Sequence, residues 1–129
     1  MSDRILYIGI ASREEIHKRM LEIANGVRRH MPGDPKVWFT SAEALARVFS
    51  KKNILLIEMI RHTEPSSVTE LAERVGRAKT NVARSLKTLQ QFDVIDFEDG
   101  NGSRKAPRLR YDDFKVDGHL CGRAPIKAA

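Results

Sequence analysis

The chain is 129 residues long, which suits one domain with a modest hydrophobic core. Lys and Arg number 23 against 17 Asp and Glu, so the formal net charge is +6, a balance that favours polyanionic partners. The single cysteine, Cys121, excludes an intrachain disulfide and favours a reducing, cytoplasmic location. No apolar run approaches the length of a transmembrane helix, so we expect no membrane partner.

The N-terminal part of the chain has the pattern of a strand followed by a helix. Residues 5–10 have the β-branched and aromatic content of a strand. Ser12 and Glu15 form a capping box, after which we expect a helix to about Arg29. The apolar stripe of this helix follows helical spacing at Ile16, Met20, Ile23 and Val27. This stripe predicts packing rather than a cofactor slot, either on the chain itself or on a second copy.

A strand and two helices are expected next. Residues 36–39 form a short apolar strand able to pair with the first strand in a small sheet. Residues 40–43 are another capping box and open a short helix through Phe49. Ser50 then caps a helix over residues 51–62. That helix is apolar over much of its circumference, as expected for the most buried helix of a small helical core, at Ile54, Leu55, Ile57, Met59 and Ile60.

The stretch from Val68 to Phe92 carries the main functional signal. Ser67 and Glu70 form a third capping box in front of it. Two short helical patterns then flank Gly76, and the second repeats apolar residues at i, i+4 and i+7: Val82, Leu86 and Leu89. The small side chain of Ala72, four residues before Gly76, lets two helices cross closely through a tight turn. This pattern is typical of a helix-turn-helix.

The polar face of the second helix is unusual in its composition. At about 100° per residue, the face opposite the apolar stripe holds Thr80, Asn81, Arg84, Lys87, Thr88 and Gln91. None of these is a carboxylate, whereas an ordinary amphipathic helix mixes both signs on its exposed face. Donors and cations without acids are what reading base edges and phosphates in a major groove requires. The plainer alternative is a two-helix corner whose exposed face happens to be basic.

The sequence after this helix predicts a wing. Residues 93–98 have a strand pattern, a glycine-rich turn cluster spans residues 99–103, and a cationic strand follows as far as Tyr111. Pro107 suits an exposed edge or tip, because it has no backbone N–H to donate. We expect the wing, residues 99–108, to lie along the DNA backbone or to enter the minor groove.

Positive charge is concentrated in this proposed binding unit. Residues 74–110 hold nine Lys or Arg and four Asp or Glu, which accounts for +5 of the net +6. The residues that we expect to contact DNA are Arg77, Lys79, Thr80, Asn81, Arg84, Lys87, Thr88, Arg104, Lys105 and Arg108. Lys79, Thr80, Asn81 and Arg84 would lie nearest the bases. The wing cations would hold phosphates.

The chain resembles MarR-type winged-helix transcriptional regulators in the run from Glu70 to Ile95, with its L-A-x-x-V-G, N-V-A-R-x-L-x-x-L and D-V-I segments. It is more closely similar to a small group of predicted prokaryotic regulators with an N-terminal strand–helix extension, through residues 38–45 and 111–116. The resemblance covers about residues 5–117. It implies an intracellular, dimeric DNA-binding regulator, and some relatives are suspected antitoxins. The helix pair that builds the MarR dimer after the wing is missing here, which favours the N-terminal strand and helix as the dimer contact.

The sequence does not assemble a catalytic or metal site. His17, His30, His62 and His119 have no second histidine or cysteine at metal-ligand spacing. The acidic cluster in residues 93–99 lacks the ligand ladder of a calcium loop. Nothing brings together a nucleophile, a base and an orienting group. We therefore expect a non-enzyme without cofactors.

These patterns predict an α+β, mainly helical fold in three parts. Residues 1–39 form an extension suited to dimerisation, residues 40–117 a winged helix-turn-helix domain, and residues 118–129 a flexible tail. We expect a sequence-specific, double-stranded-DNA-binding transcriptional regulator with helix 78–91 in the major groove. Two alternatives stay open. One is a protein-interaction module, such as an antitoxin that masks a partner toxin and autoregulates its operon; the other is an enzyme or ligand-gated sensor with a pocket between the N-terminal helix and the core.

Overall fold

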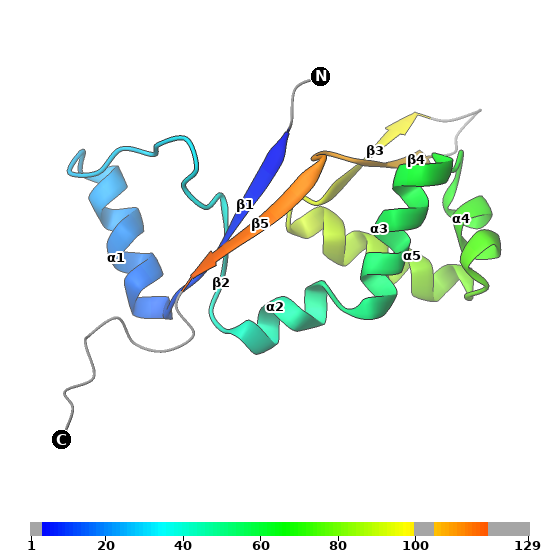
Figure 1. The fold of residues 1–129 in the computed structure, drawn as a ribbon, viewed down its shortest axis with the longest axis horizontal. Coiled ribbons are helices and arrows are strands. Elements are labelled where there is room, and N and C mark those ends of the chain that lie inside the picture. Colours follow the sequence, from blue (N-terminus) through cyan, green and yellow to red (C-terminus); the bar gives the residue numbers. More distant parts are fainter. Residues whose placement is uncertain (1–3, 100–104, 119–129) are drawn as a thin grey trace. The chain divides into compact units, whose positions relative to one another are not determined.

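The computed structural model of the chain describes residues 4–99 and 105–118, which form five α-helices and five β-strands in a small α+β fold (Figure 1). The chain divides into two compact units. Residues 4–5, 46–99 and 105–113 form what we call the central unit, and residues 6–45 with 114–118 form the terminal unit. Among the described residues, every helix is too short or too polar to cross a membrane.

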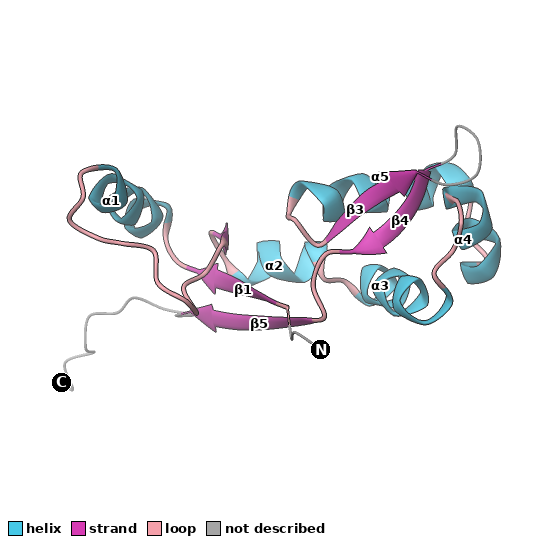
Figure 2. Cartoon of the chain, turned by 90° about the horizontal axis from the view of Figure 1, so that it is seen from above, coloured by secondary structure: helices cyan, strands magenta, loops and turns pink. Residues whose placement is uncertain are grey.

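The terminal unit is built on a three-stranded sheet in the order β2-β1-β5. Its strands are β1 (Ile5–Ile10), β2 (Val37–Phe39) and β5 (Asp113–Gly118). β2 pairs with β1, as expected, and the pairing is parallel; β5 lies along the other edge of β1 and points the same way (Figure 2). The central position of β1 explains its continuous apolar sequence, because both of its edges are paired and most of its side chains are buried.

One glycine fixes the spacing inside this sheet. Gly9 lies opposite Trp38 in the β1–β2 register. A Cβ atom at Gly9 would lie 2.4 Å from Trp38 Cζ3, which is far too close for any side chain. The indole can therefore approach the β1 backbone this closely only because residue 9 is glycine.

Helix α1 (Arg13–Ala24) begins as predicted, with the Ser12 hydroxyl accepting a hydrogen bond from the Glu15 backbone N–H at 3.1 Å. The prediction that it continues to Arg29 is wrong. The helix ends at Ala24 because Asn25 caps it and Gly26 adopts a left-handed conformation with φ of 77°.

The apolar stripe of α1 is not packed within the described chain. No residue of the helix is buried, and Met20, Ile23 and Val27 are 56%, 40% and 76% exposed. We expected the stripe to pack either on the chain itself or on a second copy. Packing on the chain itself is not observed among the described residues. The face of α1 towards the sheet carries charged side chains instead.

The central unit holds three helices that follow each other closely. After α2 (Ala42–Val48), which begins in the terminal unit, come α3 (Lys51–Thr63), α4 (Val68–Val75) and α5 (Lys79–Gln91). Ser50 caps α3 as predicted, and its hydroxyl accepts a hydrogen bond from the Asn53 N–H at 3.2 Å. The core of the unit contains fully buried leucine, isoleucine and valine side chains: Leu56, Ile60, Leu71, Val82, Leu86, Leu89 and Val94.

Helix α3 is less buried than its sequence predicts. Leu56, Ile57 and Ile60 are in the core, but Ile54 and Leu55 are 45% and 51% exposed. The apolar residues around much of the circumference of this helix are therefore only partly buried. Ile54 and Leu55 lie on the side of the helix that faces away from α4 and β4, the elements on which α3 packs.

Two antiparallel strands complete the central unit: β3 (Ile95–Asp99) and β4 (Lys105–Leu109). In their register Phe97 lies opposite Pro107. Pro107 is almost fully buried, so the prediction that it is exposed at an edge or tip is wrong. β4 is nevertheless a strand paired on one side only, which removes the need for a Pro107 N–H.

The units do not coincide with the predicted domain limits. The boundary between the first two parts falls inside α2, after Leu45, rather than at residue 40. Residues 114–118 pair with β1 in the terminal unit, whereas the sequence suggested that the strand near residue 116 closes the central domain. The predicted tail, residues 118–129, lies outside the described residues except for Gly118.

Candidate nucleic-acid interface

The turn between α4 and α5 fixes the direction of α5. Gly76 ends α4 with φ of 69°, in the left-handed region, and the Arg77 N–H donates to the Ala72 carbonyl oxygen at 3.1 Å. No atom lies within 4 Å of a Cβ built at Gly76, so this position requires glycine for its backbone conformation and not for close packing. Ala72 supplies the close packing, since it is 4% exposed.

The start of α4 is also held by side chains. The Ser67 hydroxyl accepts from the Glu70 N–H at 3.1 Å, as the capping box predicts. The Glu70 carboxylate accepts from the N–H of Ser66, one residue before the position expected in a capping box. This hydrogen bond, with the nearby Arg74 guanidinium, lowers the pKa of Glu70 below its ordinary value.

Helix α5 separates apolar and polar side chains as its sequence predicts. Val82, Leu86 and Leu89 are fully buried against the rest of the unit. What we call the α5 polar face consists of Lys79, at the start of the helix, and of the residues opposite the apolar stripe, Thr80, Asn81, Arg84, Lys87, Thr88 and Gln91, all exposed except the half-buried Thr88. The face therefore presents amide, hydroxyl and cationic groups to solvent, with no carboxylate from α5 among them.

The cations of the α5 polar face differ from most others in the central unit. Within the part of the chain that the structure describes, no ion pair involves Lys79, Arg84 or Lys87. By contrast, Arg74 lies 3.6 Å from Glu70, and Arg110 lies 2.7 Å from Asp93. The three cations of α5 therefore remain uncompensated, whereas Arg74 and Arg110 next to the helix are paired.

Arg77 occupies a different environment from the other predicted contacts on this helix pair. Its Nη2 donates to the Ser85 hydroxyl at 3.3 Å, and its Nη1 is buried without a hydrogen-bond partner. The side chain therefore lies along α5 and braces the turn. A buried guanidinium nitrogen without a partner is costly in an isolated protein.

The cations of the β3–β4 pair are already engaged. Lys105 Nζ lies 2.6 Å from Asp99 Oδ1, and this hydrogen bond, with the charge of Lys105, lowers the pKa of Asp99. Arg108 Nε lies 3.0 Å from Glu98 Oε1, and its Nη1 donates to the Pro65 carbonyl oxygen at 2.7 Å. The structure therefore does not group Lys105 and Arg108 with the unpaired cations of α5. Arg104 and the turn at residues 100–103 lie outside the described residues.

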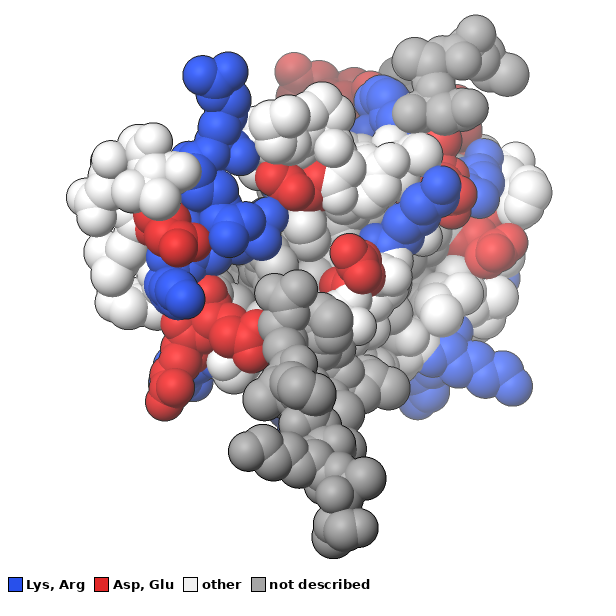
Figure 3. All heavy atoms as spheres, turned by 60° about the vertical axis from the view of Figure 1, so that its left-hand side comes forward, with Lys and Arg blue, Asp and Glu red and all other residues white. Residues whose placement is uncertain are grey.

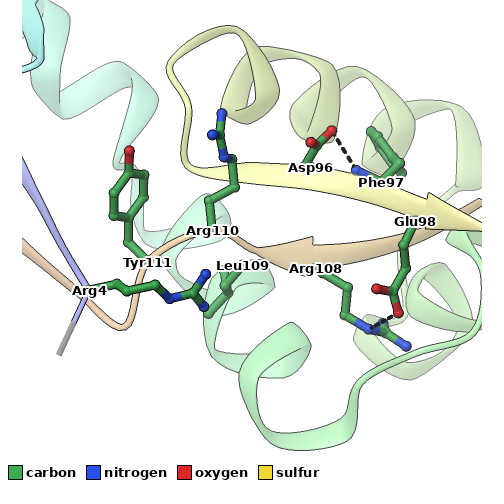
Figure 4. Close-up of a pocket in the computed structure, with 8 residues that line it drawn as sticks. All are labelled: Arg4, Asp96, Phe97, Glu98, Arg108, Leu109, Arg110 and Tyr111. Atoms are coloured by element: carbon green, nitrogen blue, oxygen red, sulfur yellow. Dashed lines mark hydrogen bonds and ion pairs between the residues drawn. The ribbon is translucent and has the colours of Figure 1, made fainter. Parts of the chain in front are cut away.

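A shallow cavity of about 410 Å³ lies on the β3–β4 pair. Figure 4 shows that its walls come from both strands and from Arg4, with the Arg108–Glu98 ion pair at one end. Asp96 Oδ1 in this cavity accepts from the Phe97 N–H at 2.8 Å. The cavity lacks a nucleophile beside a base, so its geometry offers binding surface rather than covalent chemistry.

A second cavity, of about 460 Å³, lies inside the terminal unit between α1 and the sheet. Its charged lining residues are Glu15, Lys18, Arg19, Glu22, Arg28, Asp34 and Asp117. Arg19 lies 3.2 Å from Asp34, and its guanidinium carbon lies 5.2 Å from the centre of the Trp38 ring. Sequence reasoning missed this cluster, because the helix spacing that brings Glu15, Arg19 and Glu22 together was interpreted only through its apolar side.

Charge in the terminal unit is mixed in sign. Arg19 pairs with Asp34 and Arg28 with Glu22, whose atoms lie 3.2 and 3.1 Å apart. On the face that Figure 3 shows, a group of Lys and Arg side chains on one side is bordered by Asp and Glu side chains. In residues 4–99 and 105–118, no group of three or more His, Cys, Asp or Glu side chains is placed to hold a metal ion.

Comparison with known proteins relates most of the central unit to one family. The model of the family HVO_A0114 matches residues 48–116, which is 69 of the 129 residues and more than half of the chain. The match includes α3, α4, α5 and the β3–β4 pair. No curated protein and no solved structure matches the chain.

Proposed function

We propose that this chain, which belongs to the HVO_A0114 family, is a sequence-specific, double-stranded-DNA-binding transcriptional regulator built on a winged helix-turn-helix. The observation that carries the proposal is the α5 polar face. It combines exposed amide and hydroxyl groups with three cations that have no ion-pair partner among the described residues. Two helices joined by a short turn, followed by an antiparallel strand pair, are the arrangement that such a reading surface requires.

In this proposal α5 enters the major groove. Lys79, Thr80, Asn81 and Arg84 lie towards its N-terminal half, which is the part of a recognition helix that contacts base edges. Arg84 suits a guanine and Asn81 an adenine, and each bidentate contact is worth about 1–3 kcal/mol. Lys87 and Thr88 lie further along the helix, where they would meet phosphates.

The β3–β4 pair serves as the wing, but its cations contribute less to the electrostatic attraction of DNA than the sequence suggests. Lys105 must give up part of its interaction with Asp99 before it can hold a phosphate, because the two atoms lie 2.6 Å apart. Arg108 holds β4 to the Pro65 carbonyl and acts on the DNA through the position of the wing. Arg77 likewise acts through the turn, where a phosphate could accept a hydrogen bond from its Nη1.

The proposed regulator acts in the cytoplasm as a homodimer, so that two α5 helices meet successive major grooves. Half-sites about 34–36 Å apart would then make the operator palindromic. Selection of bound duplexes from a random pool tests this function. A single enriched motif with two-fold symmetry is expected. Recovery of unrelated sequences with no common motif would refute sequence-specific recognition.

A protein-interaction role, as in an antitoxin that masks a partner toxin, is the second candidate. The exposed apolar residues of α1, Met20 and Ile23, are the observation that favours it. Co-expression with the product of the adjacent gene tests this role. A stable complex that is lost in the double variant Met20→Ser, Ile23→Ser is expected. An unchanged complex in that variant would exclude α1 as the contact.

A further inference from the structure

The outer face of α3 combines apolar and charged side chains in a symmetric pattern. At about 100° per residue, Ile54 and Leu55 flank a line that joins Lys51 to Glu58. Ile54 and Leu55 are 45% and 51% exposed. Lys51 and Glu58 are also exposed. The centre of the pattern lies between Ile54 and Leu55, and the two opposite charges lie equally far from it along the helix.

This face is separate from the one that α3 uses in the core. Leu56, Ile57 and Ile60 are buried on the opposite side of the helix, where α3 packs on α4 and β4. α3 is thus apolar on two sides, and the packing of the central unit accounts for only one of them. A single exposed leucine would need no explanation, but two adjacent large apolar residues between opposite charges form a surface suited to a partner.

We propose that the outer face of α3 is the contact between two copies of this chain, paired antiparallel about a two-fold axis that passes between Ile54 and Leu55. Such an axis places residue i of one copy opposite residue 109 − i of the other. Ile54 then meets Leu55 of the second copy, and Lys51 meets Glu58. Because the contact is isologous, each of these pairs forms twice.

Charge complementarity selects a second copy as the partner. Lys51 has no ion pair among the described residues, and Glu58 has only the exposed His62 at 3.6 Å. A helix of the same sequence running in the opposite direction supplies a cation for Glu58 and an acid for Lys51 at once.

Pairing through α3 is compatible with DNA binding by α5, and the proposed dimer does not require DNA binding. Figure 2 shows α5 next to β3 and α3 next to β4. α3 packs on α4 and β4, and α5 packs on α4 and β3. Pairing through α3 therefore leaves the α5 polar face open. Dimerisation can be measured without DNA, so its failure is distinct from failure of the proposed function.

Sedimentation equilibrium of the full chain without DNA tests the contact. Wild-type protein should dimerise, and the single variants Lys51→Glu and Glu58→Lys should each raise the dimer dissociation constant by at least about tenfold, because each places like charges opposite one another twice. The control Lys52→Glu makes the same charge change at the next residue, outside the proposed contact, and should leave the constant within about twofold. Circular dichroism verifies that each variant is folded.

A mixture of the two single variants gives the sharpest result. The Lys51→Glu chain carries two acids on this face and the Glu58→Lys chain two cations, so native mass spectrometry should show a heterodimer in preference to either homodimer. The double variant Lys51→Glu, Glu58→Lys should restore the homodimer. A wild-type monomer at high concentration, a dimer that tolerates both single variants, or a mixture without heterodimer would each overturn the proposal; the second result would transfer the contact to another surface such as α1.

Discussion

Arg108 Nη1 donates a hydrogen bond of 2.7 Å to the carbonyl oxygen of Pro65, a residue 43 positions earlier in the chain. The same guanidinium pairs with Glu98, so it joins β4 both to β3 and to the loop in front of α4. The buried Pro107 next to it extends this junction into the core. The β3–β4 pair is thereby fixed to the start of the helix pair that carries α5.

Arg108→Ala should destabilise the protein rather than remove a simple phosphate contact. We expect the free energy of unfolding to fall by about 1–3 kcal/mol, because the Pro65 carbonyl loses a charged donor and Glu98 loses its cation. Urea unfolding measures this change. Lys105→Ala is the control, since its exposed pair with Asp99 should contribute little. Equal free energies of unfolding for the two variants would show that the Arg108 contacts do not stabilise the protein.

Asp99→Asn should tighten DNA binding at low salt. The carboxylate of Asp99 engages Lys105, as its lowered pKa reflects, and its removal frees the lysine for a phosphate and takes away one negative charge. We expect the dissociation constant to fall about twofold to fivefold, with the gain lost at high salt. Fluorescence anisotropy on a fixed duplex at two salt concentrations measures it. Asp96→Asn provides a charge-matched control on the same strand.

The helices of the central unit could be predicted closely from local signals. The Ser50 and Ser67 caps, Gly76, and the spacing of Val82, Leu86 and Leu89 all act within a few residues of one another. The polar face of α5 follows from the same spacing, because a helix that buries one side must expose the other.

Features that depend on distant partners could not be predicted in the same way. Pairing of β5 with β1 joins the two ends of the chain, and no short-range pattern encodes it. Lys105 pairs with Asp99, which the β3–β4 register brings opposite it, whereas Arg108 pairs with Glu98, two residues along β3 from its opposite residue, and with the Pro65 carbonyl. The exposure of Ile54 and Leu55 was missed because composition alone does not reveal which side of α3 meets the core.

Stability should fall in acid partly through Glu70. Its pKa is lowered from the ordinary 4.5 by the hydrogen bond from the Ser66 N–H and by Arg74, so this contribution is present above pH 4.5 and is lost as pH falls through the lowered pKa. Thermal unfolding between pH 6 and pH 3 measures the effect. Glu70→Gln should be less stable than wild type near neutral pH and should lose less stability on acidification. Parallel pH profiles for the two proteins would contradict this role of Glu70.

Glu64→Gly should stabilise the central unit. Glu64 ends α3 with φ of 43°, in the left-handed region that favours glycine over residues with a Cβ atom. Glycine removes this backbone strain, and the benefit outweighs the cost of its greater freedom in the unfolded chain. We therefore expect the free energy of unfolding to rise by about 0.5–1 kcal/mol. Differential scanning calorimetry would record a higher melting temperature. His62→Gly, at a position inside the helix, serves as the comparison and should lower the melting temperature.

Lys87→Ala should weaken binding to all duplexes alike. Its side chain is exposed on α5 and has no ion pair in the described part of the chain, so it is available to a phosphate. The slope of log K against log salt concentration should decrease in magnitude by about one. Titrations at several salt concentrations measure the slope. A loss confined to one sequence would show instead that Lys87 contacts a base.

The central claim, that the α5 polar face reads base sequence, is tested most directly with Arg84→Ala. Its affinity is measured on the duplex selected from the random pool and on a scrambled duplex of the same length and composition. We predict a loss of about 5- to 100-fold on the selected duplex and little change on the scrambled one, because a bidentate arginine–guanine contact discriminates by about 1–3 kcal/mol. Equal losses on both duplexes, or no loss on either, would contradict the claim.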